Sequence, residues 1–105
     1  MERTAHGDIG MISTIVRMRF AKENRQDVVE AVQSLTAASR QEPGCVSFIP
    51  HELAGDSSLV LIYEQYRDEA ALEAHRASPH FHKYVIGGLY QWMKERSVED
   101  LNALA

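Results

Sequence analysis

Histidine, carboxylate and phenol side chains gather in one stretch of the chain, between residues 63 and 84. The stretch contains Tyr63, Glu64, Tyr66, Asp68, His75, His80, His82 and Tyr84. Imidazoles and carboxylates are the groups that proteins most often use for general acid–base chemistry. Histidine suits a base that works near neutral pH, because its reference pKa is about 6.5. Proton transfer is therefore the chemistry to expect if the fold brings these groups together.

Glu64 is the first candidate, because it alternates with apolar residues. It shares a strand face with Val60 and Ile62. A carboxylate on such a face is either paired or held in a pocket that raises its pKa. The alternative is a structural ion pair with a basic residue such as Arg17.

His75 and His80 are the two candidate bases. His75 ends a short helical segment and lies three residues after Leu72, so both can face the sheet. The alternative is a histidine that only interacts with the helix dipole. His80 lies in the first turn after Pro79 and shares a helix face with Tyr84; otherwise it is a partly exposed histidine at a helix start.

Metal and nucleotide cofactors have no visible anchor in the sequence. His80 and His82 are two residues apart, so on a helix they point in different directions and do not chelate together with His75. The chain has no cysteine pair, no His-Glu-x-x-His pattern and no glycine-rich phosphate loop. We expect no metal and no cofactor.

Composition excludes several classes of partner. The net charge is −4 and the basic residues are scattered, which argues against nucleic-acid binding. No apolar run is long enough to span a bilayer. A lone cysteine, Cys45, fits a reducing compartment, so a cytoplasmic protein is expected. Residues 1–10 are polar and glycine-containing and are interpreted as a flexible extension; residues 11–105 are one domain.

In the first half of the domain the sequence predicts a strand, a helix and a second strand. Residues 11–20 alternate apolar and polar side chains with β-branched enrichment, which indicates a strand. A helix follows from an N-cap at Asn24 and ends at Glu42-Pro43-Gly44. Residues 45–53 form a second strand, and Pro50 places it at a sheet edge or a bulge.

In the second half the sequence predicts a strand, a helical region broken in two and a last strand. Residues 59–66 are a strand, and Asp68 caps a short helix over residues 69–76. Another helix begins at Ser78-Pro79, and Gly87-Gly88 within it indicates a kink or the close approach of another backbone. Residues 96–101 are a weaker strand. The order β-α-β-β-α-β predicts a ferredoxin-like α+β fold, the split β-α-β arrangement with an antiparallel sheet.

A sheet with helices on one side leaves its other face open. That face carries Ile15, Leu59, Leu61 and Tyr63. An apolar second face on a small domain needs a cover, and a second copy of the sheet provides one. We therefore expect a homodimer.

Several segments together resemble the antibiotic biosynthesis monooxygenase family. They are Glu42-Pro43-Gly44-Cys45, Tyr63-Glu64-Gln65-Tyr66, DEAALEAH at residues 68–75 and Ser78-Pro79-His80-Phe81. The resemblance runs over residues 11–93, with Tyr66 where many relatives carry tryptophan. It implies a dimeric α/β barrel with an apolar pocket in each subunit. It also implies oxidation of quinols or polycyclic anthrones by O₂, without metal or flavin.

The leading hypothesis is therefore a cofactor-independent monooxygenase acting on a small aromatic substrate and O₂. His75 is the first candidate base and His80 the second, with Glu64 orienting an imidazole. Expected substrate-binding residues are Tyr63, Tyr66, Phe81, Tyr84, Trp92 and Arg17.

Three alternatives stay open on the same fold. An isomerase of a small phosphorylated carbohydrate would need cations in the pocket, with Arg17, Arg67 or Lys83 as candidates. A non-catalytic dimer that binds a small ligand is the second. Haem degradation is the third, and it is disfavoured because relatives of that kind resemble this chain in fold but use an Asn–Trp–His set. Arg17 and His75 stand at the positions that match their asparagine and tryptophan.

Overall fold

A single antiparallel β-sheet positions the residues of the candidate site. The computed structural model describes residues 10–105. Its four strands are β1 (Ile12–Phe20), β2 (Cys45–Leu53), β3 (Asp56–Tyr66) and β4 (Met93–Leu101). They form one sheet in the order β2-β3-β1-β4, and every neighbouring pair is antiparallel. β2 is an edge strand, as its proline predicted.

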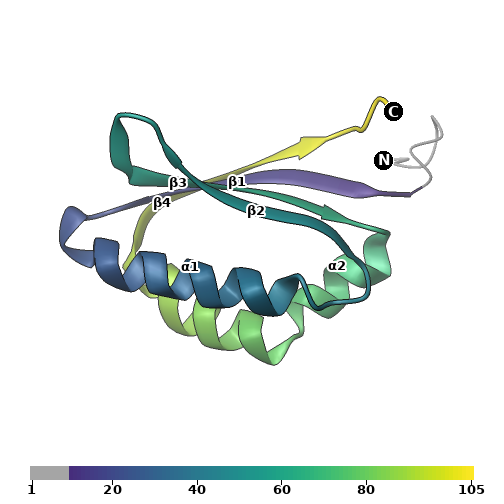
Figure 1. The fold of residues 1–105 in the computed structure, drawn as a ribbon, viewed down its shortest axis with the longest axis horizontal. Coiled ribbons are helices and arrows are strands. Elements are labelled where there is room, and N and C mark those ends of the chain that lie inside the picture. The colour runs from purple at the N-terminus through teal and green to yellow at the C-terminus, as the bar shows by residue number, and fades with distance from the viewer. Residues whose placement is uncertain (1–9) are drawn as a thin grey trace.

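The helices all lie on one side of this sheet (Figure 1). They are η1 (Lys22–Asn24), α1 (Arg25–Ser39), α2 (Glu69–Arg76), the π-helix η2 (Phe81–Leu89) and the single turn α3 (Tyr90–Trp92). With the sheet order this is the predicted ferredoxin-like α+β fold. None of the helices in residues 10–105 is long and apolar enough to cross a membrane.

The core lies between the sheet and the helices. Its largest fully buried apolar side chains are Tyr66, Phe48, Ile62 and Leu89. Further buried members are Met18, Phe20, Val28, Val32, Leu35, Val60 and Val85. The helical positions among them recur every three or four residues along α1, which is why this helix turns one apolar stripe to the sheet.

The predicted irregularity at Gly87-Gly88 is a π-helix, not a contact with another backbone. A Cβ at Gly87 would lie 3.3 Å from the carbonyl oxygen of His82, and one at Gly88 would lie 3.6 Å from the Trp92 ring. These neighbours belong to the same helical region, so the wider π turn itself accounts for the glycines.

Some element boundaries differ from the predictions. β3 begins at Asp56 and β4 at Met93, earlier than the expected residues 59 and 96. Apart from the partly buried Met93, both extra segments are polar, and they are strands because they pair with a neighbour, not because their side chains alternate. Asn24 occupies the N-cap position of α1 without a side-chain hydrogen bond. The expected flexible extension falls on residues 1–9, outside the described residues, and on Gly10.

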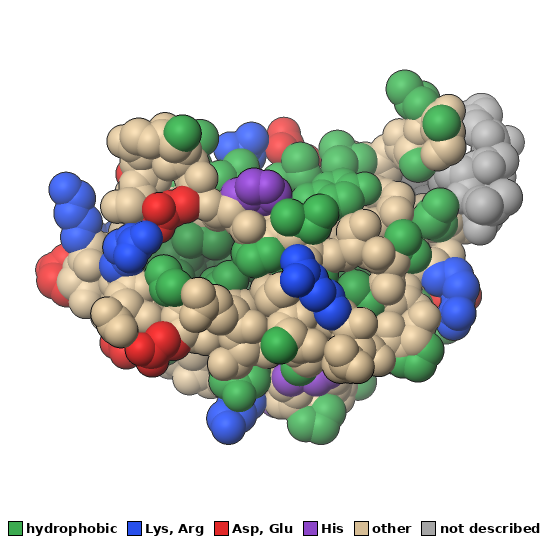
Figure 2. Space-filling view, viewed as in Figure 1, with side chains coloured by type: hydrophobic (Ala, Val, Ile, Leu, Met, Phe, Trp, Pro, Cys, Tyr) green, Lys and Arg blue, Asp and Glu red, His purple; other side chains and the backbone are tan. Residues whose placement is uncertain are grey.

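The open face of the sheet carries apolar side chains at its centre. Ile15 is paired with Tyr63 in the β1–β3 ladder, and Tyr63 is paired with Ile49 in the β2–β3 ladder. Ile49 is 42% exposed, and Ile15 and Tyr63 are half-buried. In the space-filling view, hydrophobic side chains also lie along the sheet layer above the helices (Figure 2).

Candidate active site

A cavity of about 250 Å³ opens between β1, β3 and β4 on one side and α2 and η2 on the other. Its lining residues are Ile12, Thr14, Val16, Glu64, Glu69, Leu72, His75, Arg76, Phe81, Tyr90, Arg96, Val98 and Asp100. A smaller hollow of about 40 Å³ shares Glu64, His75 and Phe81 with it and reaches into the core. The cavity thus joins an apolar interior to His75, Glu64 and further ionisable side chains.

The start of α2 fixes the position of His75. Asp68 caps this helix through a 2.8 Å hydrogen bond that its side chain accepts from the backbone N–H of Ala71. The turn before β2 packs directly on the same segment, since a Cβ at Gly44 would overlap the Cβ of Ala71. The backbone N–H of Arg67 also donates to the carbonyl of Gly44 at 2.8 Å. The Pro43-Gly44 turn therefore brings the segment at Glu42 beside α2.

Glu42 joins the two candidate histidines. Its Oε2 lies 2.8 Å from Nδ1 of His75 and 2.5 Å from Nε2 of His80. His75 is 3% exposed, so its ring is enclosed, whereas the His80 side chain is 18% exposed. Oε1 of Glu42 is buried and has no hydrogen-bond partner among the described residues. One carboxylate oxygen thus serves both imidazoles while the other is unused.

Glu64 lies on the other side of His75. Its Oε1 is 3.9 Å from Nε2 of His75 and accepts a 2.7 Å hydrogen bond from the hydroxyl of Tyr66. Burial raises the pKa of the Glu64 carboxyl, although the Tyr66 hydrogen bond and His75 act in the opposite direction. Burial and the neighbouring Glu64 likewise raise the pKa of Tyr66, so this phenol stays protonated and donates.

Aromatic rings enclose the His75 imidazole. The ring centroids of Tyr66, Phe81, Phe48 and His80 lie 5.1, 5.3, 5.9 and 6.0 Å from it. Such a shell restricts the imidazole to one orientation and keeps water from most of its surface. Nδ1 therefore faces Glu42, and Nε2 faces Glu64 beside the cavity.

The predicted catalytic residues are brought close together, but only two of them reach the cavity. His75 and Glu64 line it. His80 is not among the lining residues and reaches His75 through Glu42. Glu64 does not hold an imidazole by a hydrogen bond, as the orienting role required; Glu42 makes that contact to both rings.

Of the expected substrate-binding residues, Phe81 alone lines the cavity. Tyr66 is fully buried behind Glu64. Tyr84 and Trp92 pack against the core instead of the cavity. None of the three lines the cavity.

Tyr63 and Arg17 lie on the opposite face of the sheet. Successive residues of a strand point to opposite faces, so Tyr63 cannot share the cavity with Glu64. Arg17 is exposed there and pairs with Glu99 at 3.4 Å. Neither residue lines the cavity of its own chain.

Sequence reasoning missed Glu42, Tyr90, Arg76 and Arg96 as site residues. In the sequence, Glu42 belongs to a helix end and to one segment of the family resemblance, and 33 positions separate it from His75. Arg96 lies with its Cζ 5.6 Å from the Tyr90 ring centroid. The only sequence signal at Glu42 is the Glu-Pro-Gly turn. A turn motif does not predict which other segment of the chain packs against it.

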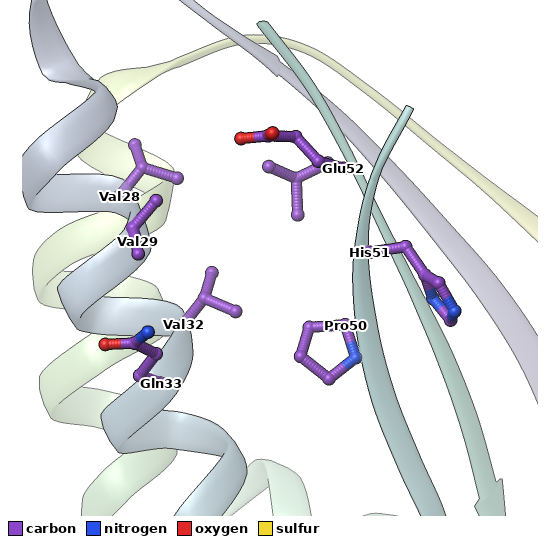
Figure 3. A pocket seen from close by; sticks show the side chains of 8 residues that line it. Val28, Val29, Val32, Gln33, Pro50, His51 and Glu52 are labelled. Atoms are coloured by element: carbon purple, nitrogen blue, oxygen red, sulfur yellow. The ribbon is translucent and has the colours of Figure 1, made fainter. Parts of the chain in front are cut away.

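A second cavity, of about 180 Å³, lies between α1 and β2. Val28, Val29, Val32 and Gln33 face Pro50 across it, while the His51 ring points away (Figure 3). The hollow is also visible from outside (Figure 2). It is mainly apolar and holds no group placed for proton transfer.

The residues that could hold a metal ion are not the set considered from the sequence. Glu42, His75 and His80 offer ligand atoms that all lie within 4.8 Å of one another. His82 is exposed and its Nδ1 lies 3.1 Å from the carbonyl of Ser78, away from this group.

The chain matches the family model described as "Antibiotic biosynthesis monooxygenase" over residues 11–86. It is 30% identical to "Putative monooxygenase YcnE" of Bacillus subtilis, over 74% of this chain and 82% of that protein. It is 33% identical to "Putative monooxygenase Rv0793" of Mycobacterium tuberculosis, over 70% of this chain and 71% of that protein.

Two further relatives are informative for length and fold. "Uncharacterized protein sll1783" of Synechocystis is 32% identical over 65% of this chain, and the match spans 46% of that longer protein. A solved structure from Bacteroides thetaiotaomicron, titled as a "Putative antibiotic biosynthesis monooxygenase", aligns with a TM-score of 0.87. Identity is 26%, and the alignment covers 94% of each chain.

Proposed function

The chain belongs to the antibiotic biosynthesis monooxygenase family, and from this premise we propose that it oxidises a quinol with O₂ without a cofactor. The proposal gives His75 the role of the base that removes a proton from the substrate. The proposal rests mainly on the hydrogen bond between Nδ1 of His75 and Glu42, because this bond decides which ring nitrogen can accept a proton.

An ionised Glu42 can only accept hydrogen bonds, so it requires a proton on Nδ1 of His75 and on Nε2 of His80. The Nε2 of a neutral His75 then carries a lone pair and faces the cavity. When Nε2 takes the hydroxyl proton of a quinol, the imidazolium that forms is stabilised by the carboxylate on its other side. Glu42 is thus the positioning residue, and His75 is the group that touches substrate.

The reaction balances without an external reductant. The quinolate supplies four electrons to O₂; one oxygen atom enters the ring to give a hydroxyquinone, and the other leaves as water. The protein needs to bind and deprotonate the substrate and to keep bulk water away from the anion. The apolar wall at Phe81, Val16 and Leu72 suits a flat ring.

Cavity size favours a small substrate. A volume of about 250 Å³ lies below the usual range for ligand pockets, about 300 to 1,000 Å³. A quinol of one or two rings fits this space better than a polycyclic anthrone does.

The charges at the cavity weigh against the phosphorylated carbohydrate. Two arginines, Arg76 and Arg96, line it, but so do the carboxylates Glu64, Glu69 and Asp100. Arg17, Arg67 and Lys83, the cations expected for a phosphate, are not among the lining residues. A dianionic group would meet more negative than positive side chains.

We further propose that the protein works as a homodimer in the cytoplasm. A partner sheet laid on the open face would cover Ile15, Leu61 and Tyr63, and such obligate interfaces bury about 2,000 Å² or more. The single half-buried cysteine, Cys45, fits a reducing compartment.

Oxygen uptake tests the proposed reaction. Metal-stripped protein is incubated with a panel of benzoquinols, naphthoquinols and anthrones, and oxygen consumption is followed with product analysis. We expect uptake above the protein-free rate for the smaller quinols, with hydroxyquinone as product. No uptake with any member of the panel would refute the quinol proposal.

Ligand binding without turnover would identify the alternative. If a quinone or quinol binds at the cavity but no compound is converted, the protein is a non-catalytic binding dimer. Fluorescence quenching of the chain's single tryptophan, Trp92, together with mass spectrometry of the recovered ligand, separates the two cases.

A further inference from the structure

Three side chains that can bind a metal lie together behind the cavity, although one of them is far from the other two in the sequence. Glu42 comes from the turn before β2, His75 from the last turn of α2 and His80 from the start of the next helix. Two imidazole nitrogens and a carboxylate within 4.8 Å form a donor set suited to Zn²⁺ and other first-row divalent ions. We propose that Glu42, His75 and His80 form a binding site for such an ion.

The unused oxygen of Glu42 points to a missing partner. Buried polar atoms are almost always hydrogen-bonded, and one that is not needs an explanation such as an ion. Oε1 of Glu42 is buried and unpaired, while Oε2 of the same carboxylate contacts both rings. A cation bound through both oxygens of the carboxylate would give Oε1 the partner that it lacks.

Glu64 supplies the support that metal-bound histidines normally have. A ligating imidazole usually donates its other N–H to a carboxylate, which fixes the ring and strengthens the bond to the metal. Oε1 of Glu64 lies 3.9 Å from Nε2 of His75, on the side away from Glu42. A small movement would convert this contact into the hydrogen bond that a metal on Nδ1 requires.

A bound ion would replace the hydrogen bonds of Glu42 with His75 and His80. In a tetrahedral site with bonds of about 2.0 to 2.1 Å, neighbouring donor atoms lie about 3.3 Å apart. The present separations of 2.8 and 2.5 Å must therefore widen by about 0.5 to 0.8 Å. The backbone N–H of Glu42 donates a 3.0 Å hydrogen bond to the carbonyl of Ser39, which fixes the backbone at this turn. The flexible side chain of Glu42 would therefore move to widen these separations.

Metal binding and base function exclude each other at His75. With the ion on Nδ1, the ring proton moves to Nε2, and Nε2 can then only donate. The lone pair that the proposed oxidation needs is lost. The metal is therefore an inhibitor of the activity and not its cofactor; this consequence, unlike the binding itself, rests on the proposed function.

Titration with Co²⁺ tests the site directly. Untagged protein freed of metal by chelation is titrated while the visible absorption of tetrahedral Co²⁺ is recorded, and Zn²⁺ is then added as a competitor. We expect one ion per chain. Glu42→Gln and His80→Gln should weaken binding by more than about 100-fold, and Glu64→Gln by about tenfold to 100-fold.

Matched controls use two exposed histidines that lie outside the cluster. His82→Gln and His51→Gln should leave affinity and stoichiometry unchanged. Circular dichroism and thermal melting of each variant establish that it is folded. No saturable binding by the wild type, or an equal loss of binding in a control variant, would overturn the proposal.

Nitrogen-15 NMR of the histidine rings gives a second readout that needs no variant. Without metal, His75 should show a protonated Nδ1; with one equivalent of Zn²⁺ it should show a protonated Nε2. Unchanged ring signals in the presence of bound metal would place the ion elsewhere and refute the site. If Zn²⁺ binds as expected but oxygen uptake is absent throughout, the site stands and the oxidation proposal fails.

Discussion

The two faces of the sheet differ in kind, although the same strands supply both. On β3, Glu64 points toward the helices and borders the cavity, whereas its neighbour Tyr63 points to the open face. The covered face combines a close-packed core with a few buried polar groups. The open face carries a half-buried apolar centre, and the ion pair of Arg17 with Glu99 lies beside it. Strand alternation thus lets one short segment border the cavity on one side and the open apolar face on the other.

A substitution expected to remove both the dimer and much of the stability tests whether the open face is covered. Ile15→Glu places a charge at its centre and should abolish the dimer and lower the free energy of unfolding by about 3 kcal/mol, because folding and association share this surface. Sedimentation and thermal unfolding measure both. Ala37→Glu, on the exposed side of α1, is the control. A well-folded monomeric Ile15→Glu protein with unchanged melting would contradict the dimer.

A pair of leucines compares the two faces quantitatively. Leu89→Ala, in the core under the helices, should cost about 2 to 5 kcal/mol of unfolding free energy. Leu61→Ala on the open face should cost about 2 kcal/mol if a partner covers it, but only about 0.5 kcal/mol if it faces water. Urea unfolding at several protein concentrations distinguishes these values, and a small, concentration-independent loss for Leu61→Ala would count against the dimer.

Gly44→Ala disturbs the covered face alone. The added Cβ would overlap Ala71, so α2 must move away from the turn that carries Glu42. We expect a loss of about 1 to 3 kcal/mol and a weakened contact between Glu42 and His75. Thermal melting and the ring NMR signals of His75 report the two effects. Unchanged ring signals would show that the turn does not position Glu42.

The smallest effect is a pH dependence from Glu64. Its pKa is raised by burial, so between the ordinary value for glutamate, about 4.3, and the raised value the folded chain holds a proton that the unfolded chain has lost. Wild-type stability should therefore fall as pH rises through this interval. Glu64→Gln cannot ionise, so it should gain stability relative to wild type over the same interval. A pH-independent difference in urea unfolding would contradict the raised pKa.

Local sequence signals predicted most of the fold. β2 and α2 have the expected bounds, because Gly44 comes directly before the first and Asp68 caps the second. β4 was predicted too short, since its exposed residues form a strand only through pairing with β1.

The site was less predictable, because its decisive contact is long-range. His75, His80 and Phe81 are close in sequence and could be recognised as one group. Glu42 joins them only after the turn at Gly44 packs on α2, and no local pattern encodes that contact. Strand alternation, by contrast, was available from the sequence and already separates Tyr63 and Arg17 from Glu64.

The most direct test of the central claim is the rate of oxygen uptake by His75→Gln. With the best quinol of the panel, the account predicts a rate about 100-fold to 10,000-fold below that of wild type, since a general base is lost. His82→Gln, which alters an exposed imidazole away from the cavity, should keep the wild-type rate. If folded His75→Gln protein consumed oxygen at the wild-type rate, His75 would not be the base, and the role given to the Glu42 contact would be wrong.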